Sequence, residues 1–254
     1  MNFRVVIPAR QGSSRLPGKP LIEVAGAPLI RHVCMRALES AADEVWLATD
    51  DERIGTACEG LEVRVAMTSG AHPTGTDRIA EVAAREGWAE DDIVVNLQGD
   101  EPLMPARALD VVASALTGDA GADMATLAIR LHDPALFRDP HVVKLVADGA
   151  GHALYFSRAP IPRPRADESE LPNEALRHVG LYAYRAAALA RLAAEPPCDM
   201  ERAEGLEQLR ALWLGMRIRI EVAEEMPLAA VDTEADIARI ARLLEARATD
   251  GASV

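Results

Sequence analysis

The amino-acid sequence predicts an α/β fold, with a Rossmann-like, mainly parallel twisted sheet and a smaller antiparallel element. In the first part of the chain, short apolar runs alternate with amphipathic segments, and strands separated by helices form parallel sheets through right-handed crossovers. After residue 142, two apolar runs instead flank Asp148-Gly149, a pair that favours a tight hairpin turn. The length of 254 residues suits one large domain. We therefore predict a single domain over residues 1–254, with the antiparallel element embedded at about 142–200.

Four strands and two helices are predicted before residue 100. The apolar runs that predict the strands are 3–8, 44–49, 62–67 and 92–98. Between the first two runs, apolar side chains recur at the spacing of one buried helical face, at Ile30, Val33, Cys34, Ala37 and Leu38. A similar but weaker pattern follows the third run, at Ile79, Val82 and Ala83. Each helix is therefore expected to connect two parallel strands.

The second half of the chain mixes strands, helices and one long loop. The hairpin at 142–158 is followed by a proline- and charge-rich stretch, 159–175, which we predict to be a surface loop because proline removes ladder donors. The next predicted elements are a strand at 178–185, a helix at 200–213 and a strand at 216–223. A last helix is predicted over 233–248, with Thr233 as its N-cap and Asp236 three residues further on.

Charge and composition exclude several classes of function. The net charge of −13 argues against general nucleic-acid binding, because phosphate contacts demand a basic surface. No stretch approaches the roughly 20 apolar residues of a membrane helix, and the amino terminus lacks a basic region followed by a long apolar run. Cys34, Cys58 and Cys198 are irregularly spaced, which fits neither a disulfide framework nor a thiolate zinc site. We expect a cytoplasmic protein with buried or idle thiols and without nucleic-acid or membrane partners.

The loop after the first strand is basic although the whole protein is acidic. The first 22 residues contain Arg4, Arg10, Arg15 and Lys19 and no acidic residue. Residues 9–19 also contain two glycines and two serine hydroxyls. Backbone amides freed by glycines can cradle phosphates, and cations can neutralise them. This composition predicts a focused site for a small anion.

Two familiar phosphate-binding loops do not match this segment. Gly12 and Gly18 are one residue too far apart for the Walker pattern, and Pro20 stands where that pattern needs a magnesium-binding hydroxyl. No Gly-x-Gly-x-x-Gly follows the strand, which argues against a dinucleotide-binding loop. A solvated turn is the alternative. It accounts poorly for this combination of residues at the carboxyl edge of a strand, where open α/β sheets bind ligands.

The loop and eight later segments together resemble the sugar-activating nucleotidyltransferases. The loop carries IPARxxSxRLPGKPL at 7–21. The later segments are ATD (48–50), HPTGTDR (72–78), NLQGDEP (96–102), VVKLV (142–146), ALYFSRAPIP (153–162), RHVGLYAYR (177–185), LEQLR (206–210) and VDTEADI (231–237). The resemblance is strongest to the branch of that family that activates 3-deoxy-manno-octulosonate (Kdo) with CTP. Several motifs in the same order are more specific than any single motif.

The resemblance implies transfer of CMP from CTP to the anomeric 2-hydroxyl of Kdo, with release of pyrophosphate, in lipopolysaccharide biosynthesis. It also implies Mg²⁺ as cofactor and a homodimer in which the antiparallel element is the dimerisation element. Gln11-Gly12 replaces a more usual aromatic-Ala pair, and Gly205 falls inside the predicted helix at 200–213. Gly205, together with the unusual loop at 163–175, leaves the acceptor open. An 8-amino analogue of Kdo, another acidic sugar and a catalytically silent nucleotide-binding module remain alternatives.

Nucleotidyl transfer needs cations for the phosphate charge, and the resemblance assigns them. Lys19, Arg15 and Asp100 are the predicted catalytic residues. The predicted nucleotide-binding residues are Ala9, Arg10, Arg15, Lys19, Thr74, Gly75, Thr76 and Gln98. Arginine forks match phosphate oxygens and lysine acts as a point charge. In the segment around Gly75, Thr74 or Thr76 would offer a hydroxyl to the nucleotide and Asp77 would start the next helix, but a helix-start box alone is an equally good interpretation.

The resemblance also assigns a metal site and a sugar site. Asp100 and Asp232 are the predicted Mg²⁺ ligands, since hard carboxylate oxygens suit this ion. Taken alone, Asp100 would be a turn former and Asp232 a residue at a helix start. The predicted sugar-binding residues are Gln98, Arg158, His178, Tyr182, Glu207 and Gln208. Arg158 is expected to bind the sugar carboxylate with both arms of its fork, whereas a strand histidine such as His178 is more often structural.

Overall fold

The computed structural model divides the chain into two units, each described here by itself. The first unit comprises Met1–Trp88, Val94–Asp110 and Pro227–Val254, and the second comprises Ala89–Ile93 and Val111–Met226. The structure describes residues 2–12, 16–165, 171–224, 231 and 233–251. None of the helices in those ranges is both long and apolar enough to cross a membrane. The three cysteines are free and buried, as the sequence predicts.

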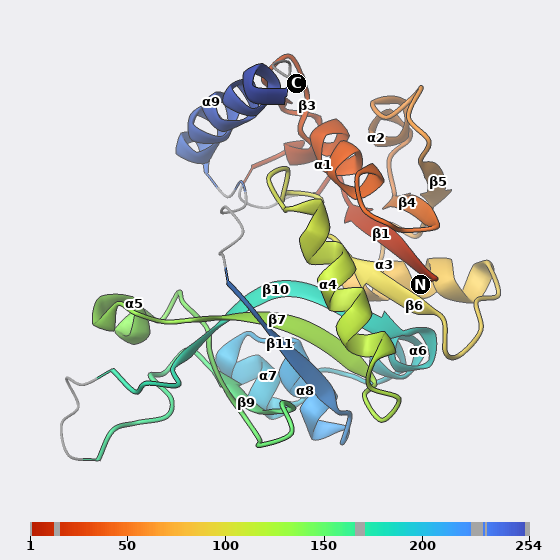
Figure 1. The fold of residues 1–254 in the computed structure, drawn as a ribbon. Helices are drawn as coiled ribbons and strands as arrows, with labels where there is room; N and C mark the ends of the chain where they lie inside the picture. The colour runs from red at the N-terminus through yellow and green to blue at the C-terminus, as the bar shows by residue number, and fades with distance from the viewer. Residues whose placement is uncertain (1, 13–15, 166–170, 225–230, 232, 252–254) are drawn as a thin grey trace. The chain divides into compact units, whose positions relative to one another are not determined.

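The first unit contains the parallel strands that the sequence predicts. β1 (Phe3–Ala9) pairs in parallel with β4 (Glu44–Thr49), and β4 pairs in parallel with β5 (Arg64–Met67). β6 (Ile93–Asn96) lies on the other side of β1, where Leu97 N donates to Val6 O at 3.1 Å. The order within this unit is therefore β6-β1-β4-β5 (Figure 1). The carboxyl ends of β1 and β4 lie at one edge, because the two strands run in the same direction.

The two predicted helices connect these strands, and a short helix that was not predicted lies between β4 and β5. α1 (Leu29–Leu38) follows a small antiparallel pair, β2 (Glu23–Val24) and β3 (Ala27–Pro28), and packs on β1 and β4 (Figure 1). Its buried residues are Leu29, Ile30, Val33, Cys34 and Ala37, so four of the five predicted positions are buried, Leu29 is added, and the predicted Leu38 is only half-buried. α2 (Glu52–Thr56) lies between β4 and β5, and α3 (Gly75–Arg85) packs on β1.

The carboxyl-terminal helix belongs to the first unit. α9 (Glu234–Gly251) begins with the predicted cap, in which Asp236 N donates to Thr233 Oγ1 at 3.3 Å and Thr233 N donates to Asp236 Oδ2 at 2.9 Å. Its Ile240 lies in an apolar cluster with Val24, Leu29, Leu103 and Val231. α9 therefore packs against the segment that follows the basic loop. α4 (Ala106–Thr117) starts in this unit and ends in the second.

The second unit is a mixed sheet that is mostly antiparallel. β10 (Leu176–Arg185) pairs in antiparallel fashion with β7 (Met124–Arg130) and with β8 (Lys144–Ala147). β8 and β9 (Ala153–Ser157) form the predicted hairpin, and β11 (Ile218–Ala223) runs parallel to β7. β7 was not predicted, although it lies between β11 and β10 (Figure 1).

The second unit also corrects one predicted helix. Residues 200–213 form two helices, α7 (Asp199–Glu204) and α8 (Gln208–Trp213), instead of one. Gly205 separates them with φ 63°, a left-handed conformation that glycine adopts without the steric cost of a Cβ atom. The glycine that looked misplaced inside a helix is therefore a helix end. The remaining helices of this unit are α5 (Pro134–Arg138) and α6 (Ala186–Ala194).

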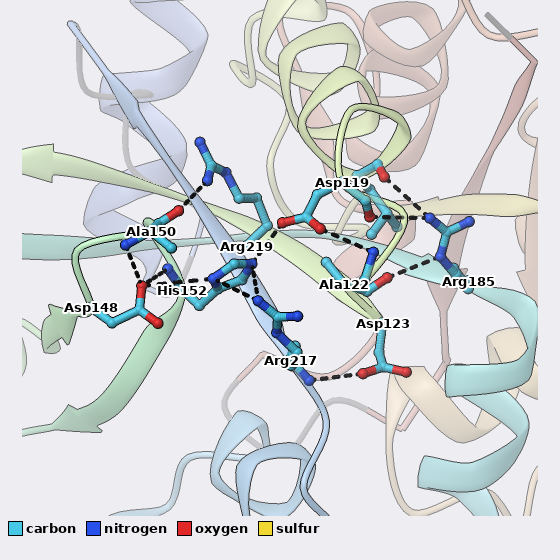
Figure 2. Close-up of polar contacts among 11 residues, drawn as sticks. Asp119, Ala122, Asp123, Asp148, Ala150, His152, Arg185, Arg217 and Arg219 are labelled. Atoms are coloured by element: carbon cyan, nitrogen blue, oxygen red, sulfur yellow. Dashed lines mark hydrogen bonds and ion pairs between the residues drawn. The ribbon is translucent and has the colours of Figure 1, made fainter.

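A polar cluster ties the β8–β9 turn to the loop before β7 and to β11 (Figure 2). His152 Nε2 lies 2.6 Å from Asp119 Oδ2, and Arg217 Nη2 lies 3.3 Å from the same ring. Asp148 Oδ1 accepts from the main-chain N–H groups of Ala150 and His152 at 2.8 and 2.9 Å. The hydrogen bond from His152 holds the pKa of the Asp119 carboxyl below its usual value. The ionised carboxylate is therefore favoured in the folded state.

We expect Asp119→Asn to lower the free energy of unfolding by about 1 kcal/mol at pH 7, the usual size of a partly exposed charge-assisted hydrogen bond. A depressed folded pKa contributes stability above the unfolded value of about 3.9, and this contribution is lost as the pH falls through the folded value. Urea unfolding at pH 7 and at acidic pH, with Asp91→Asn as an exposed control, measures the difference. If the difference in the free energy of unfolding between wild type and Asp119→Asn does not shrink at acidic pH, the ionised Asp119 carboxylate does not stabilise the fold in this way.

Candidate active site

The loop after β1 and the loop after β6 meet at an ion pair. Lys19 Nζ lies 2.5 Å from Asp100 Oδ2, and the two side chains are 12% and 32% exposed. Lys19 begins a 3₁₀ turn, η1 (Lys19–Leu21), which starts after Gly18 in the left-handed conformation at φ 69°. The ion pair therefore brings together two of the three predicted catalytic residues, one from each loop.

The chain approaches closely at the end of β1, where two glycines leave the necessary space. A Cβ atom on Gly99 would lie 2.8 Å from Pro8 O, so a larger residue there would displace the loop that carries Asp100. A Cβ atom on Gly75 would lie 3.0 Å from Pro8 Cγ and 3.8 Å from Gln98 Oε1. Gly75 opens α3, so the amino terminus of this 11-residue helix lies beside the end of β1 and beside Gln98. Free N–H groups at a helix start favour anions.

The other predicted nucleotide-binding residues have different surroundings. Ala9 is buried at the end of β1, and Arg10 is exposed. Thr74 Oγ1 accepts from Asp77 N at 3.1 Å and donates to Asp77 Oδ2 at 2.8 Å, which confirms the capping interpretation of this segment. Thr76 is buried in the first turn of the helix. Arg15 lies outside the described residues.

Two residues of the matched motifs had no predicted role and prove to connect the loop to α3. Arg78 is 2% exposed, and its Nη2 lies 3.0 Å from Asp50 Oδ2, while its Nη1 donates to Thr68 Oγ1. Asp50 Oδ1 also accepts from Gln11 N at 3.2 Å. A buried arginine therefore reaches the loop through one carboxylate. The motifs ATD and HPTGTDR contain both residues, and a charged residue within an apolar helical face was the signal available.

Asp100 fits a magnesium site of the kind that uses few protein ligands. Asp100 O accepts from Val231 N at 3.0 Å, so the residue before Asp232 lies beside Asp100. Asp232 itself lies outside the described residues. No group of three or more His, Cys, Asp or Glu side chains in the described part of the chain is arranged to hold a metal. Mg²⁺ does not require such a group, because it commonly binds one or two carboxylates together with substrate phosphates and water.

Two predicted sugar-binding residues of the second unit carry buried polar atoms with no partner in the described residues. Tyr182 is 9% exposed and Gln208 is 6% exposed, and neither the Tyr182 hydroxyl nor Gln208 Nε2 makes a hydrogen bond there. Burial raises the pKa of Tyr182 well above its usual value, so the hydroxyl keeps its proton. A buried donor without a partner costs free energy. Both groups are therefore available to a ligand rich in hydroxyl groups.

His178 is a neutral residue in an aromatic environment. Its ring lies 5.1 Å from the Phe156 ring and 5.3 Å from the Tyr182 ring, and desolvation lowers its pKa to about 3. The single hydroxyl proton of Thr126 is shared between the carbonyls of Val179 and Leu181, so Thr126 Oγ1 accepts from His178 Nε2, 3.1 Å away. Nδ1 is then the unprotonated nitrogen. His178 can accept a hydrogen bond from a sugar hydroxyl but cannot act as a cation.

Arg158 and Glu207 differ from the arrangement expected for them. Arg158 Nε donates to Glu204 O at 2.6 Å and Nη1 donates to Pro140 O at 3.1 Å, so the two-armed contact with a carboxylate is not prepared in this conformation. Glu207 is the N-cap residue of α8, and its Oε2 lies 3.9 Å from Arg210 Nη2. Gln98 Nε2 donates weakly to Asn96 Oδ1 at 3.4 Å.

Comparisons with known proteins agree with these features. The sequence profile of a family described as cytidylyltransferase matches residues 4–218. The 3-deoxy-manno-octulosonate cytidylyltransferase of Thioalkalivibrio sulfidiphilus is 51% identical over 97% of this chain and 100% of its own length. The protein of the same name from Pasteurella multocida is 45% identical over 96% of this chain and 99% of its own.

Solved structures show the same fold. A CMP:2-keto-3-deoxy-manno-octonic acid synthetase complexed with CTP superposes with a TM-score of 0.88 at 40% identity, covering 97% of this chain and 99% of the other. A 4-diphosphocytidyl-2C-methyl-D-erythritol synthase, 18% identical with a TM-score of 0.61, shares the fold alone. The chain therefore belongs to the cytidylyltransferase family, among the 3-deoxy-manno-octulosonate cytidylyltransferases.

Proposed function

We propose that this chain transfers CMP from CTP to Kdo, giving CMP-Kdo and pyrophosphate. The observation that carries the proposal is the Lys19–Asp100 ion pair at the end of β1, beside the helix start at Gly75. The ion pair and the helix start together provide a cation, a hard carboxylate and the main-chain N–H groups of a first helical turn at one sheet edge. A nucleoside triphosphate requires groups of these kinds. The relatives that are named for this reaction support the same substrates.

The chain's own residues would act mainly by positioning and by charge. Lys19 would neutralise phosphate charge that develops as pyrophosphate leaves, with Arg10 and Arg15 as further cations. Asp100, with Asp232 as its predicted partner, would hold Mg²⁺, which supplies charge neutralisation and a fixed orientation of the phosphates. The sugar would be recognised by the second unit, where Tyr182 and Gln208 each carry a buried polar atom that has no hydrogen-bond partner among the described residues.

The wider setting follows from the same reaction. We expect the product to serve lipopolysaccharide biosynthesis and the enzyme to act in the cytoplasm. The homodimer stays a prediction. It is supported by large apolar side chains that the second unit exposes, Leu154 and Trp213, each 60% exposed, since such residues are more frequent at interfaces than on free surfaces.

Release of pyrophosphate tests the reaction and the substrates together. Purified protein with Mg²⁺ is assayed with CTP, UTP, ATP or GTP against Kdo, 8-amino-Kdo, sialic acid or no acceptor. We expect release only with CTP and Kdo. Release with another acid keeps the chemistry and changes the acceptor. CTP binding without release in any combination would contradict the proposal and favour a silent nucleotide-binding module.

Replacing the unpartnered tyrosine tests the sugar site. Tyr182→Phe should leave the melting temperature unchanged or slightly higher, because it removes a buried hydroxyl that has no partner in the described residues. The KM for Kdo should rise roughly two- to tenfold, the value of one neutral hydrogen bond. The KM for CTP should not change.

Tyr155→Phe on β9 is the matched control and should alter neither constant. An unchanged KM for Kdo in Tyr182→Phe would remove Tyr182 from the sugar site.

A further inference from the structure

The guanidinium of Arg158 is anchored only by uncharged acceptors. Its Nε donates to Glu204 O at 2.6 Å and its Nη1 donates to Pro140 O at 3.1 Å, and both acceptors are main-chain carbonyls. Nη2 makes no hydrogen bond within the described residues. No carboxylate oxygen in that part of the chain forms an ion pair with this side chain. Arg158 is therefore fixed in place while its charge remains available to an anionic ligand.

The main chain on both sides of Arg158 is held by the Glu204 carboxylate. Oε2 accepts from Arg158 N at 2.9 Å, and Oε1 accepts from Ser157 Oγ at 2.6 Å. The Ser157 hydroxyl in turn accepts from Ala159 N at 3.0 Å. Glu204 thus contacts Arg158 twice, through its carboxylate to the backbone and through its own carbonyl to the side chain.

Lys144 holds the main-chain carbonyl of Arg158, whereas Glu204 holds its main-chain N–H group. The Lys144 side chain is fully buried, and Nζ donates to Arg158 O at 2.6 Å, to Asp139 O at 2.8 Å and to Val142 O. Asp139 and Val142 flank Pro140, whose carbonyl accepts from the Arg158 guanidinium. One ammonium group therefore connects the backbone of Arg158 to the segment that anchors its side chain.

Burying this lysine carries a cost that packing alone does not explain. Desolvation lowers the pKa of Lys144, which shows that its environment disfavours the charged form. A buried charge is normally retained only where it is fully hydrogen-bonded. Here all three donors are used, on three carbonyls that belong to the two segments around Arg158.

The position of Glu204 is fixed by the break between α7 and α8. Gly205 ends α7 in the left-handed conformation, which leaves Glu204 O free for Arg158 Nε. Arg210, which is 4% exposed, pairs with Glu201 at 3.0 Å and so ties α7 to α8. The unusual Gly205 is therefore part of the same arrangement.

We propose that Lys144 and Glu204 are positioning residues that hold Arg158 as the cation for the carboxylate of the acidic sugar. The inference rests on the proposed function, because it needs an acidic acceptor. Since Arg158 has no bound carboxylate of its own in the described residues, it favours an acid over a neutral sugar of the same shape. Nη2, the guanidinium nitrogen that makes no hydrogen bond within the described residues, then makes one strong hydrogen bond to the sugar carboxylate, where the sequence predicted two.

Steady-state kinetics of Lys144→Met and Glu204→Gln test this inference. Each variant should raise the KM for Kdo by about tenfold, the worth of a charge-assisted contact that is no longer aligned. The KM for CTP should stay within about twofold. The preference for Kdo over its carboxamide analogue should fall by about the same tenfold factor, because the lost contact is to the carboxylate.

Glu174→Gln, an exposed carboxylate in the same unit, is the matched control and should behave as wild type. If Lys144→Met does not fold, Glu204→Gln decides alone by the same criteria. An equal rise in the KM for Kdo and in the KM for CTP would overturn the inference. So would an unchanged preference for Kdo over its carboxamide analogue. Wild-type protein without any transfer activity would instead contradict the proposed function, so the two failures are distinguishable.

Discussion

The proposed nucleotide site depends on one contact, the ion pair between Lys19 and Asp100, which joins the loops that follow β1 and β6. It forms because β1 and β6 are neighbours in the sheet and their following loops leave at the same edge. Gly99 allows the second loop to pass against Pro8 O, and Gly18 turns the first loop so that Lys19 points to Asp100. The attraction between opposite charges holds both loops in place.

The second unit contains several polar side chains that have no charge partner or hydrogen-bond partner in the described residues. Tyr182 and Gln208 keep polar atoms without partners in the described residues. His178 is neutral, because desolvation opposes its protonation. The Arg158 guanidinium is anchored by main-chain carbonyls, and no carboxylate of the described residues pairs with it. Such arrangements are costly for stability and are expected where a ligand supplies the missing partners.

Much of the fold could be predicted because its signals are local. The buried face of α1, the cap at Thr233 and the β8–β9 hairpin each follow from spacing or turn chemistry within a few residues. β7 was missed because a short apolar run has no period that distinguishes a strand from a buried helical segment. Gly205 was misread because its left-handed conformation depends on how α7 and α8 pack.

The site was predicted less completely, since hydrogen-bond partners far apart in sequence leave no local pattern. The pairing of Lys19 with Asp100 follows from the order of the strands in the sheet, so it could have been predicted from the sequence. The two main-chain carbonyls that hold Arg158, and the buried Lys144 behind it, depend on the meeting of three distant segments. Motif matching predicted Arg158 as a sugar-binding residue but could not show which of its donors were already used.

The most direct test of the account is a double-variant cycle on the central ion pair. The kcat/KM for CTP is measured for Lys19→Met, Asp100→Asn and both together, at saturating Kdo and Mg²⁺. If Lys19 serves the phosphates and Asp100 serves the metal, each single change should cost about a hundredfold and the double variant should be at least as inactive as either. Recovery of activity in the double variant would show that the two charges only balance each other, and would contradict the account.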